Sequence, residues 1–115
     1  QWVQSDIRVR IRSKKIYQGK YYCKKATILD VNPGAKSLLK LEDGTMLENV
    51  EQSDLETVVP SIGGKVVVVR GEHRHARGLL LDKDSAKNKA QFQFLDSIEI
   101  IPLSLDDIAA YDPHL

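Results

Sequence analysis

Short stretches in which apolar and polar residues alternate restrict the fold of this chain more than any other feature. Residues 7–12 read Ile-Arg-Val-Arg-Ile-Arg, a period of two that puts three apolar side chains on one face of an extended strand and three arginines on the other. Gln91–Phe94 alternates in the same way. These patterns predict half-buried strands.

Further strands are expected in stretches that are rich in β-branched or aromatic residues and bounded by turn residues. The expected strands cover residues 7–12, 22–31, 37–41, 45–50, 57–59, 66–69, 79–82, 91–94 and 98–103. Asp43-Gly44 between two apolar stretches is typical of a hairpin. Residues 51–56 predict one tight helical turn, and Ser104-Leu105-Asp106-Asp107 has the pattern of a capping box that would begin a short helix through Tyr111. The sequence therefore predicts an all-β fold.

The strands fall into two sets separated by Pro60 and Gly63-Gly64. Each set, residues 1–60 and 61–115, has about 55 residues and four or five short strands, the size of an SH3-type barrel. The prediction is two SH3-like barrels. Barrels this small bury little core, and the linker is short, so we expect the two to pack as one rigid body.

Composition is that of a folded protein, with 42% hydrophobic and 29% charged residues among 115. The single cysteine, Cys23, excludes an internal disulfide and fits a reducing compartment, and we expect a packed thiol there. No apolar stretch approaches the ~20 residues that a membrane span needs, so no membrane partner is expected. The first residue is not Met, which suggests a fragment of a longer protein.

Charge is distributed in blocks although the net charge is only +1. Residues 1–31 carry +6 and residues 32–60 carry −4, and then residues 61–91 carry +4 and residues 92–115 carry −5. Each predicted barrel is therefore basic in its first half and acidic in its second. We expect the two basic blocks to lie on a shared side.

Arginine, lysine and tyrosine together are typical of a surface that binds phosphates and stacks on bases. The candidate RNA-binding residues are Arg8, Arg10, Arg12, Tyr17, Lys20, Tyr21, Lys24, Lys25, Arg74 and Arg77. The last two lie in a basic loop between Gly71 and Gly78. A solvated outer strand face would have the same composition, and that alternative stays open for the arginine row.

Other kinds of site find less support in the sequence. His73 and His75 lack the third and fourth ligands of a zinc site, and Cys23 lacks a nearby base, so we expect no metal, no cofactor and no enzyme activity. Seven aromatic residues leave an aromatic cage for methylated Lys or Arg open as an alternative, because the sequence cannot show whether their side chains converge.

Residues 64–78, with the strand Val66–Val69, flanking Gly71 and Gly78 and the basic Arg74, resemble a KOW motif. The wider frame of Trp2, residues 6–11 and 21–31, and Leu55-Glu56-Thr57-Val58-Val59-Pro60 resembles the C-terminal region of the G-patch and KOW motif-containing spliceosomal proteins. It is also similar, more distantly, to the C-terminal domain of Kin-type nuclear zinc-finger proteins. The similarity runs from Trp2 to Tyr111.

This resemblance implies a nuclear, monomeric RNA-binding module of a pre-mRNA splicing factor, with the second barrel a KOW domain. Its partners would be pre-mRNA or snRNA, other spliceosomal proteins and, through a G-patch outside this chain, a DEAH-box helicase. His75 stands where the KOW loop usually has glycine, which predicts a different loop course because other residues tolerate positive φ poorly. The main alternative is a protein-interaction module whose acidic stretches, residues 42–56 and 96–112, face a basic partner.

Overall fold

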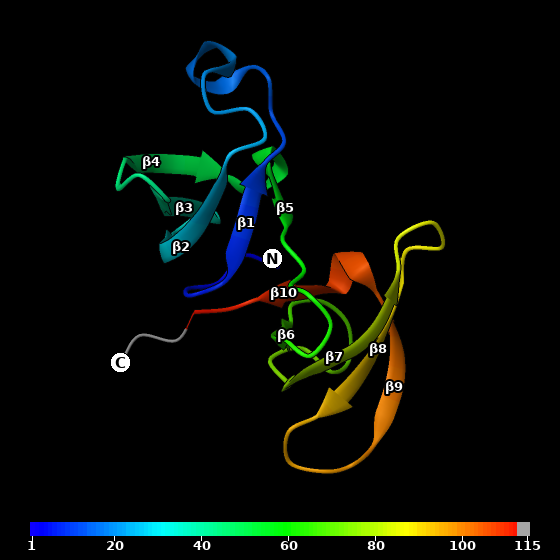
Figure 1. The fold of residues 1–115 in the computed structure, drawn as a ribbon. Coiled ribbons are helices and arrows are strands. Elements are labelled where there is room, and N and C mark those ends of the chain that lie inside the picture. The colour runs from blue at the N-terminus through cyan, green and yellow to red at the C-terminus, as the bar shows by residue number, and fades with distance from the viewer. Residues whose placement is uncertain (113–115) are drawn as a thin grey trace. The chain divides into compact units, whose positions relative to one another are not determined.

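The structure is a computed structural model that describes residues 1–112. In this range the chain forms ten β-strands and three 3-10 turns, with all strand pairs antiparallel (Figure 1). Contacts divide the chain into two compact units, residues 1–58 with Asp112 and residues 59–111. Each unit holds one five-stranded sheet, so the predicted all-β fold of two SH3-like barrels is confirmed.

The first unit is a sheet in the order β4-β3-β2-β1-β5. Its elements are β1 (Arg8–Ile11), η1 (Ile16–Gly19), β2 (Lys25–Asn32), β3 (Lys36–Leu41), β4 (Met46–Glu51), η2 (Gln52–Asp54) and β5 (Leu55–Thr57). The alternation around β1 holds, because Ile7, Val9 and Ile11 are fully buried. The predicted hairpin is present between β3 and β4, where the Gly44 N–H donates to the Leu41 carbonyl at 3.0 Å.

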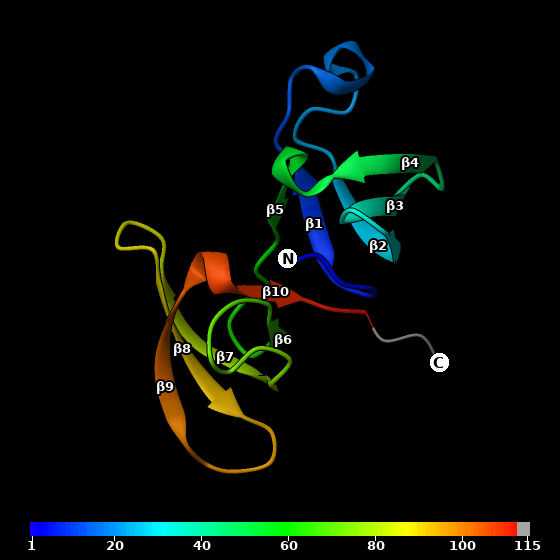
Figure 2. The same cartoon turned by 180° about the vertical axis from the view of Figure 1, so that it is seen from behind.

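The second unit is a sheet in the order β10-β6-β7-β8-β9. Its elements are β6 (Lys65–Val68), β7 (Arg77–Asp84), β8 (Lys89–Phe94), β9 (Ile100–Ser104), η3 (Leu105–Asp107) and β10 (Ile108–Ala110). Its buried core consists of Val66, Val68, Leu80, Ala90, Phe92 and Ile108. The view from behind in Figure 2 shows the β8–β9 connection extending away from the sheet.

Gly78 in β7 is required by the packing of this core. A Cβ atom there would lie 2.6 Å from the Phe92 ring and in conflict with the Gln93 carbonyl. The Phe92 ring is fully buried and covers the backbone at this point. The glycine that closes the basic loop is therefore a packing residue.

Several local expectations are wrong. The strand expected at residues 57–59 lies at Leu55–Thr57, directly after η2. Ser104 does cap a turn, accepting from Asp106 N–H at 3.2 Å, but that turn ends at Asp107, and residues 108–110 form β10 beside β6 in place of a helix through Tyr111. The second strand begins at Lys25 rather than at Tyr22. Cys23 is exposed rather than packed; it lies in the turn before β2 and adopts a left-handed φ of 66°.

Candidate nucleic-acid interface

The loop between β1 and β2, residues 13–24, combines lysines with tyrosines, and we call it the basic-aromatic loop. It extends beyond the ends of β1 and β2 and contains η1 (Figure 1). Tyr17, Gln18, Gly19 and Cys23 have φ between 49° and 79°, the left-handed region. Backbone hydrogen bonds close successive turns, among them Lys20 N–H to the Tyr17 carbonyl at 3.1 Å. The loop thus consists of successive tight turns, and its last residues do not form the start of the strand predicted at residues 22–31.

The aromatic rings of this loop lie close to its cations. The Lys14 ammonium is 5.0 Å from the centre of the Tyr22 ring, and the Lys20 ammonium is 5.4 Å from that of Tyr21. Tyr17 and Tyr21 meet edge to face with ring centres 5.5 Å apart. Tyr17 is 48% exposed and therefore has ring surface available for a base. A hydrogen bond with Cys23 raises the pKa of Tyr22 above its usual value, and the negative charge of the Cys23 thiolate adds to the effect.

The lysines of the loop and of the first position of β2 differ in their surroundings. Among residues 1–112, Lys14, Lys15 and Lys20 have no carboxylate within ion-pair distance. Lys24 and Lys25, by contrast, line a hollow with Leu41, Glu42 and Asp43. The hydrogen bond that Thr45 N–H donates at 2.9 Å is the main cause of the lowered pKa of Asp43, and the Lys24 charge lowers it further.

The arginine row of β1 is largely occupied by contacts inside the first unit. Arg8 is 2.8 Å from the Glu42 carboxylate, 3.8 Å from that of Asp112, and its side chain is 23% exposed. Arg10 is 3.5 Å from Glu56. Arg12 is exposed. The row does point away from the apolar core as expected, but two of its charges are already neutralised.

The KOW loop, residues 71–78, presents the second set of candidate residues. His75 adopts a φ of 77°, the conformation for which glycine is favoured, and its N–H donates to the Val68 carbonyl at 2.8 Å. Arg74 is exposed next to it. His75 thus adopts the left-handed conformation itself, so the reason for which we expected a different loop course does not hold here.

Arg77 lies over an aromatic ring that sequence reasoning did not assign to the site. Its guanidinium carbon is 5.1 Å from the centre of the Tyr111 ring, from the residue after β10. His73 in the same loop packs edge to face on Phe94 at 5.4 Å. The pairing of Arg77 with Tyr111 spans 34 positions of sequence, and no local pattern indicates it. Lys14 and Tyr22 also lie outside the set of candidate residues predicted from the sequence.

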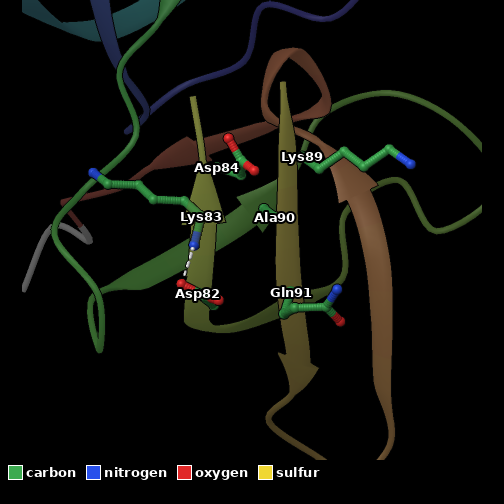
Figure 3. A pocket seen from close by; sticks show the side chains of 6 residues that line it. All are labelled: Asp82, Lys83, Asp84, Lys89, Ala90 and Gln91. Carbon is green, nitrogen blue, oxygen red and sulfur yellow. Dashed lines mark hydrogen bonds between the residues drawn. The ribbon is translucent and has the colours of Figure 1, made fainter. Parts of the chain in front are cut away.

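A small hollow at the bulge between β7 and β8 is a weaker candidate. Figure 3 shows the side chains of Asp82, Lys83, Asp84, Lys89 and Gln91 around it, with the Lys83 N–H donating to Asp82 at 2.9 Å. Acidic and basic side chains balance there, so it has no preference for an anion. Across residues 1–112 there is no group of three or more potential metal ligands, and no helix has the length and hydrophobicity that a membrane span requires.

Two SH3-like units, the second with a glycine-bounded basic loop between its first two strands, define a tandem barrel protein of the KOW type. Residues 7–112 match the family described as "GPKOW C-terminal domain". The chain belongs to this family, as its resemblance to the C-terminal region of G-patch and KOW proteins predicted.

Several curated proteins are similar along most of the chain. It is 38% identical over 114 residues to the G-patch domain and KOW motifs-containing protein of Xenopus laevis, covering 96% of this chain and 23% of that protein. It is 35% identical over 111 residues to Protein MOS2 of Arabidopsis thaliana, covering 96% and 24%. It is 32% identical over 102 residues to the human DNA/RNA-binding protein KIN17, covering 89% and 25%. The chain thus spans about a quarter of the length of these relatives.

Among solved structures, AGDP1 AGD34 of Arabidopsis thaliana aligns with 94% of this chain and 82% of its own, at 14% identity and a TM-score of 0.38.

Proposed function

We propose that this chain is a non-catalytic RNA-binding module of a nuclear pre-mRNA splicing factor. Membership of the GPKOW C-terminal domain family supports the splicing context, and the human relative named as DNA/RNA-binding supports a nucleic-acid ligand. The parent protein would engage a DEAH-box helicase through a G-patch outside this chain. The module would act as a monomer.

The observation that carries the proposal is the basic-aromatic loop. Three lysines there have no carboxylate partner in the described range, and two of the loop's lysines already lie over tyrosine rings. Phosphates would bind the ammonium groups, and unstacked bases would lie on exposed tyrosine faces. Single-stranded RNA fits this chemistry best, because its bases are free to stack.

The KOW loop would add a second set of contacts through Arg74 and Arg77, with the Arg77–Tyr111 pair as a stacking surface. Among the predicted residues, Arg8 and Arg10 would contribute least, since each would have to leave a carboxylate before it bound a phosphate. Nothing in either loop forms a fixed pattern of base-edge donors and acceptors. Binding would therefore depend little on sequence.

The test compares two triple variants of the intact chain that remove the same charge. Lys14→Ala, Lys15→Ala and Lys20→Ala together should weaken binding to oligouridylate and lower the slope of log K against log salt by up to about two, near 0.7 for each phosphate that the variant no longer binds. The control, Lys36→Ala, Lys40→Ala and Lys65→Ala, removes three exposed lysines elsewhere. If the two variants lowered the RNA affinity and the salt slope equally, the loop lysines would contribute only through the net charge of the protein, and the proposal would be overturned.

The KOW loop is tested in the same way. Arg74→Glu with Arg77→Glu should weaken RNA binding and leave the thermal midpoint nearly unchanged, whereas Lys87→Glu with Lys89→Glu serves as the control of equal charge change. If the Arg74/Arg77 variant bound RNA as tightly as the control variant, the KOW loop would not be part of the RNA interface.

A further inference from the structure

The β8–β9 connection of the second unit and the start of β9 expose three apolar side chains that are close together in the sequence. Leu95 is 54% exposed, Ile98 89% and Ile100 50%. We call residues 95–100 the apolar tip; Figures 1 and 2 show it as the long connection at the end of this hairpin. Single exposed apolar residues are ordinary, but three within six positions form a patch that is typical of an interaction site.

Hydrogen bonds hold the apolar tip in one conformation. The Phe94 N–H donates to the Glu99 carbonyl at 3.1 Å, and the Leu95 N–H donates to the Arg77 carbonyl at 3.0 Å. Inside the tip, the Glu99 N–H donates to the Ser97 hydroxyl at 3.2 Å. Ile98 is therefore presented to solvent by a folded connection, and little conformational entropy would be lost when a partner covered it.

The charge around the tip selects the kind of partner. Residues 92–112 contain no Lys, Arg or His. Within the described residues, the carboxylates of Asp96 and Glu99 have no ion-pair partner, whereas Glu42 and Glu56 in the first unit pair with arginines. Unpaired carboxylates repel RNA phosphates and attract cationic side chains.

A hollow lies along β9 and begins at Ile101, the residue after the tip. Its cavity volume is about 280 Å³, and it is lined by Ile101, Pro102, Leu103 and Asp107 and, from the KOW loop, by Gly71, Glu72 and His73. Arg70 also borders it, with its guanidinium donating to the Asp106 carbonyl at 3.3 Å. β9 is the last strand of its sheet, so within the described residues no strand pairs with its outer edge, which is the kind of edge to which an extended chain can add.

We propose that the apolar tip and the adjoining β9 hollow bind an extended polypeptide segment in which apolar residues alternate with lysine or arginine. Apolar side chains of the segment cover Ile98 and Ile100, and its cations meet Asp96, Glu99 and Asp107. A second copy of this chain is disfavoured, because pairing two tips would bring like carboxylates together. This hollow borders the KOW loop, whereas the basic-aromatic loop of the first unit contributes no residue to its lining.

The probe is an eight-residue peptide of alternating leucine and lysine with blocked ends, added to the intact ¹⁵N-labelled chain. Amide shifts should concentrate in residues 95–103. A leucine–glutamate peptide, which carries the opposite charge, and a serine–lysine peptide, which lacks apolar side chains, should leave these amides unchanged.

Ile98→Ser should weaken binding of the leucine–lysine peptide at least about tenfold, since it removes most of the apolar side chain that the bound peptide would cover. Ile62→Ser, at a residue 60% exposed elsewhere in the same unit, is the matched control and should have no effect. Asp96→Asn with Glu99→Gln should weaken binding and flatten its salt dependence.

Three outcomes would overturn the inference: equal binding of the leucine–glutamate peptide, an Ile98→Ser affinity equal to that of the unchanged chain, or self-association in sedimentation that Ile98→Ser abolishes. Each leaves the RNA proposal untouched, because that proposal depends on the loop variants alone.

Discussion

Replacing Gly78 with alanine tests the packing of the second unit. Glycine inside a strand is ordinarily unfavourable, so alanine there would usually raise stability by about 0.5–1 kcal/mol. Here the new methyl group would lie 2.6 Å from the buried Phe92 ring and against the Gln93 carbonyl, which belongs to the neighbouring strand. Phe92 is fully buried and cannot move outward without opening the core.

The expected cost follows from these two conflicts. Overpacking a core costs about 1–3 kcal/mol, and displacing a strand weakens ladder hydrogen bonds worth about 1 kcal/mol each. We therefore expect Gly78→Ala to lower the free energy of unfolding by about 3 kcal/mol, and the midpoint of thermal unfolding by roughly 12 °C. Circular dichroism gives the midpoint, and hydrogen exchange of the Leu80 and Phe92 amides places the loss in the second unit.

Two controls separate steric conflict from backbone strain. Gly71 has a φ of 92° and open space around it, so Gly71→Ala should cost only about 1 kcal/mol, from the left-handed conformation. Phe92→Leu should cost less in the Gly78→Ala background than alone, with a coupling of at least about 1 kcal/mol. A Gly78→Ala protein within about 0.5 kcal/mol of the original would refute the reasoning.

Two further predictions concern loops. His75→Gly should raise the free energy of unfolding by about 0.5 kcal/mol, because relief of the left-handed φ of 77° exceeds the entropy that glycine adds to the unfolded chain; a lower stability in urea unfolding would contradict it. The bond from Thr45 N–H lowers the pKa of Asp43, so the stability it gives the β3–β4 turn is present above about pH 4 and is lost as pH falls through the folded-state pKa. A carboxyl NMR titration should place the Asp43 midpoint below that of an unstructured aspartate, and an ordinary midpoint would exclude the effect.

Strands were predictable because their signal is local. The alternation in residues 7–11 determines which side chains are buried, and Asp43-Gly44 determines where the chain reverses. The prediction of a C-terminal helix was wrong because the structure of this segment is determined by a contact with a distant strand. Ser104 supplies a real cap, but Ile108 and Ala109 are buried beside β6, and that tertiary pairing outweighs a local preference for helix.

The candidate site was predictable in composition and not in geometry. The arginine row faces outward as its period requires, yet Arg8 meets Glu42 across 34 positions of sequence, and Arg10 meets Glu56 across 46. Pairs at that separation depend on strand order, which no local pattern contains. The turns of the basic-aromatic loop could not be predicted for another reason. Apart from Gly19, the residues with left-handed φ in this loop are of types that seldom adopt that conformation.

The C-terminal end bears on any experiment that divides the chain. After β10 the backbone returns to the first unit, where the Asp112 N–H donates to the Asp6 carbonyl at 2.8 Å and the Asp112 carboxylate lies 3.8 Å from Arg8. A fragment ending at Pro60 would lack both interactions. Its lower stability would then reflect the missing end as well as the missing second unit. Avidity between the two loops is therefore better measured in the intact chain, where variants of each loop and of both together show whether one RNA strand engages them at once.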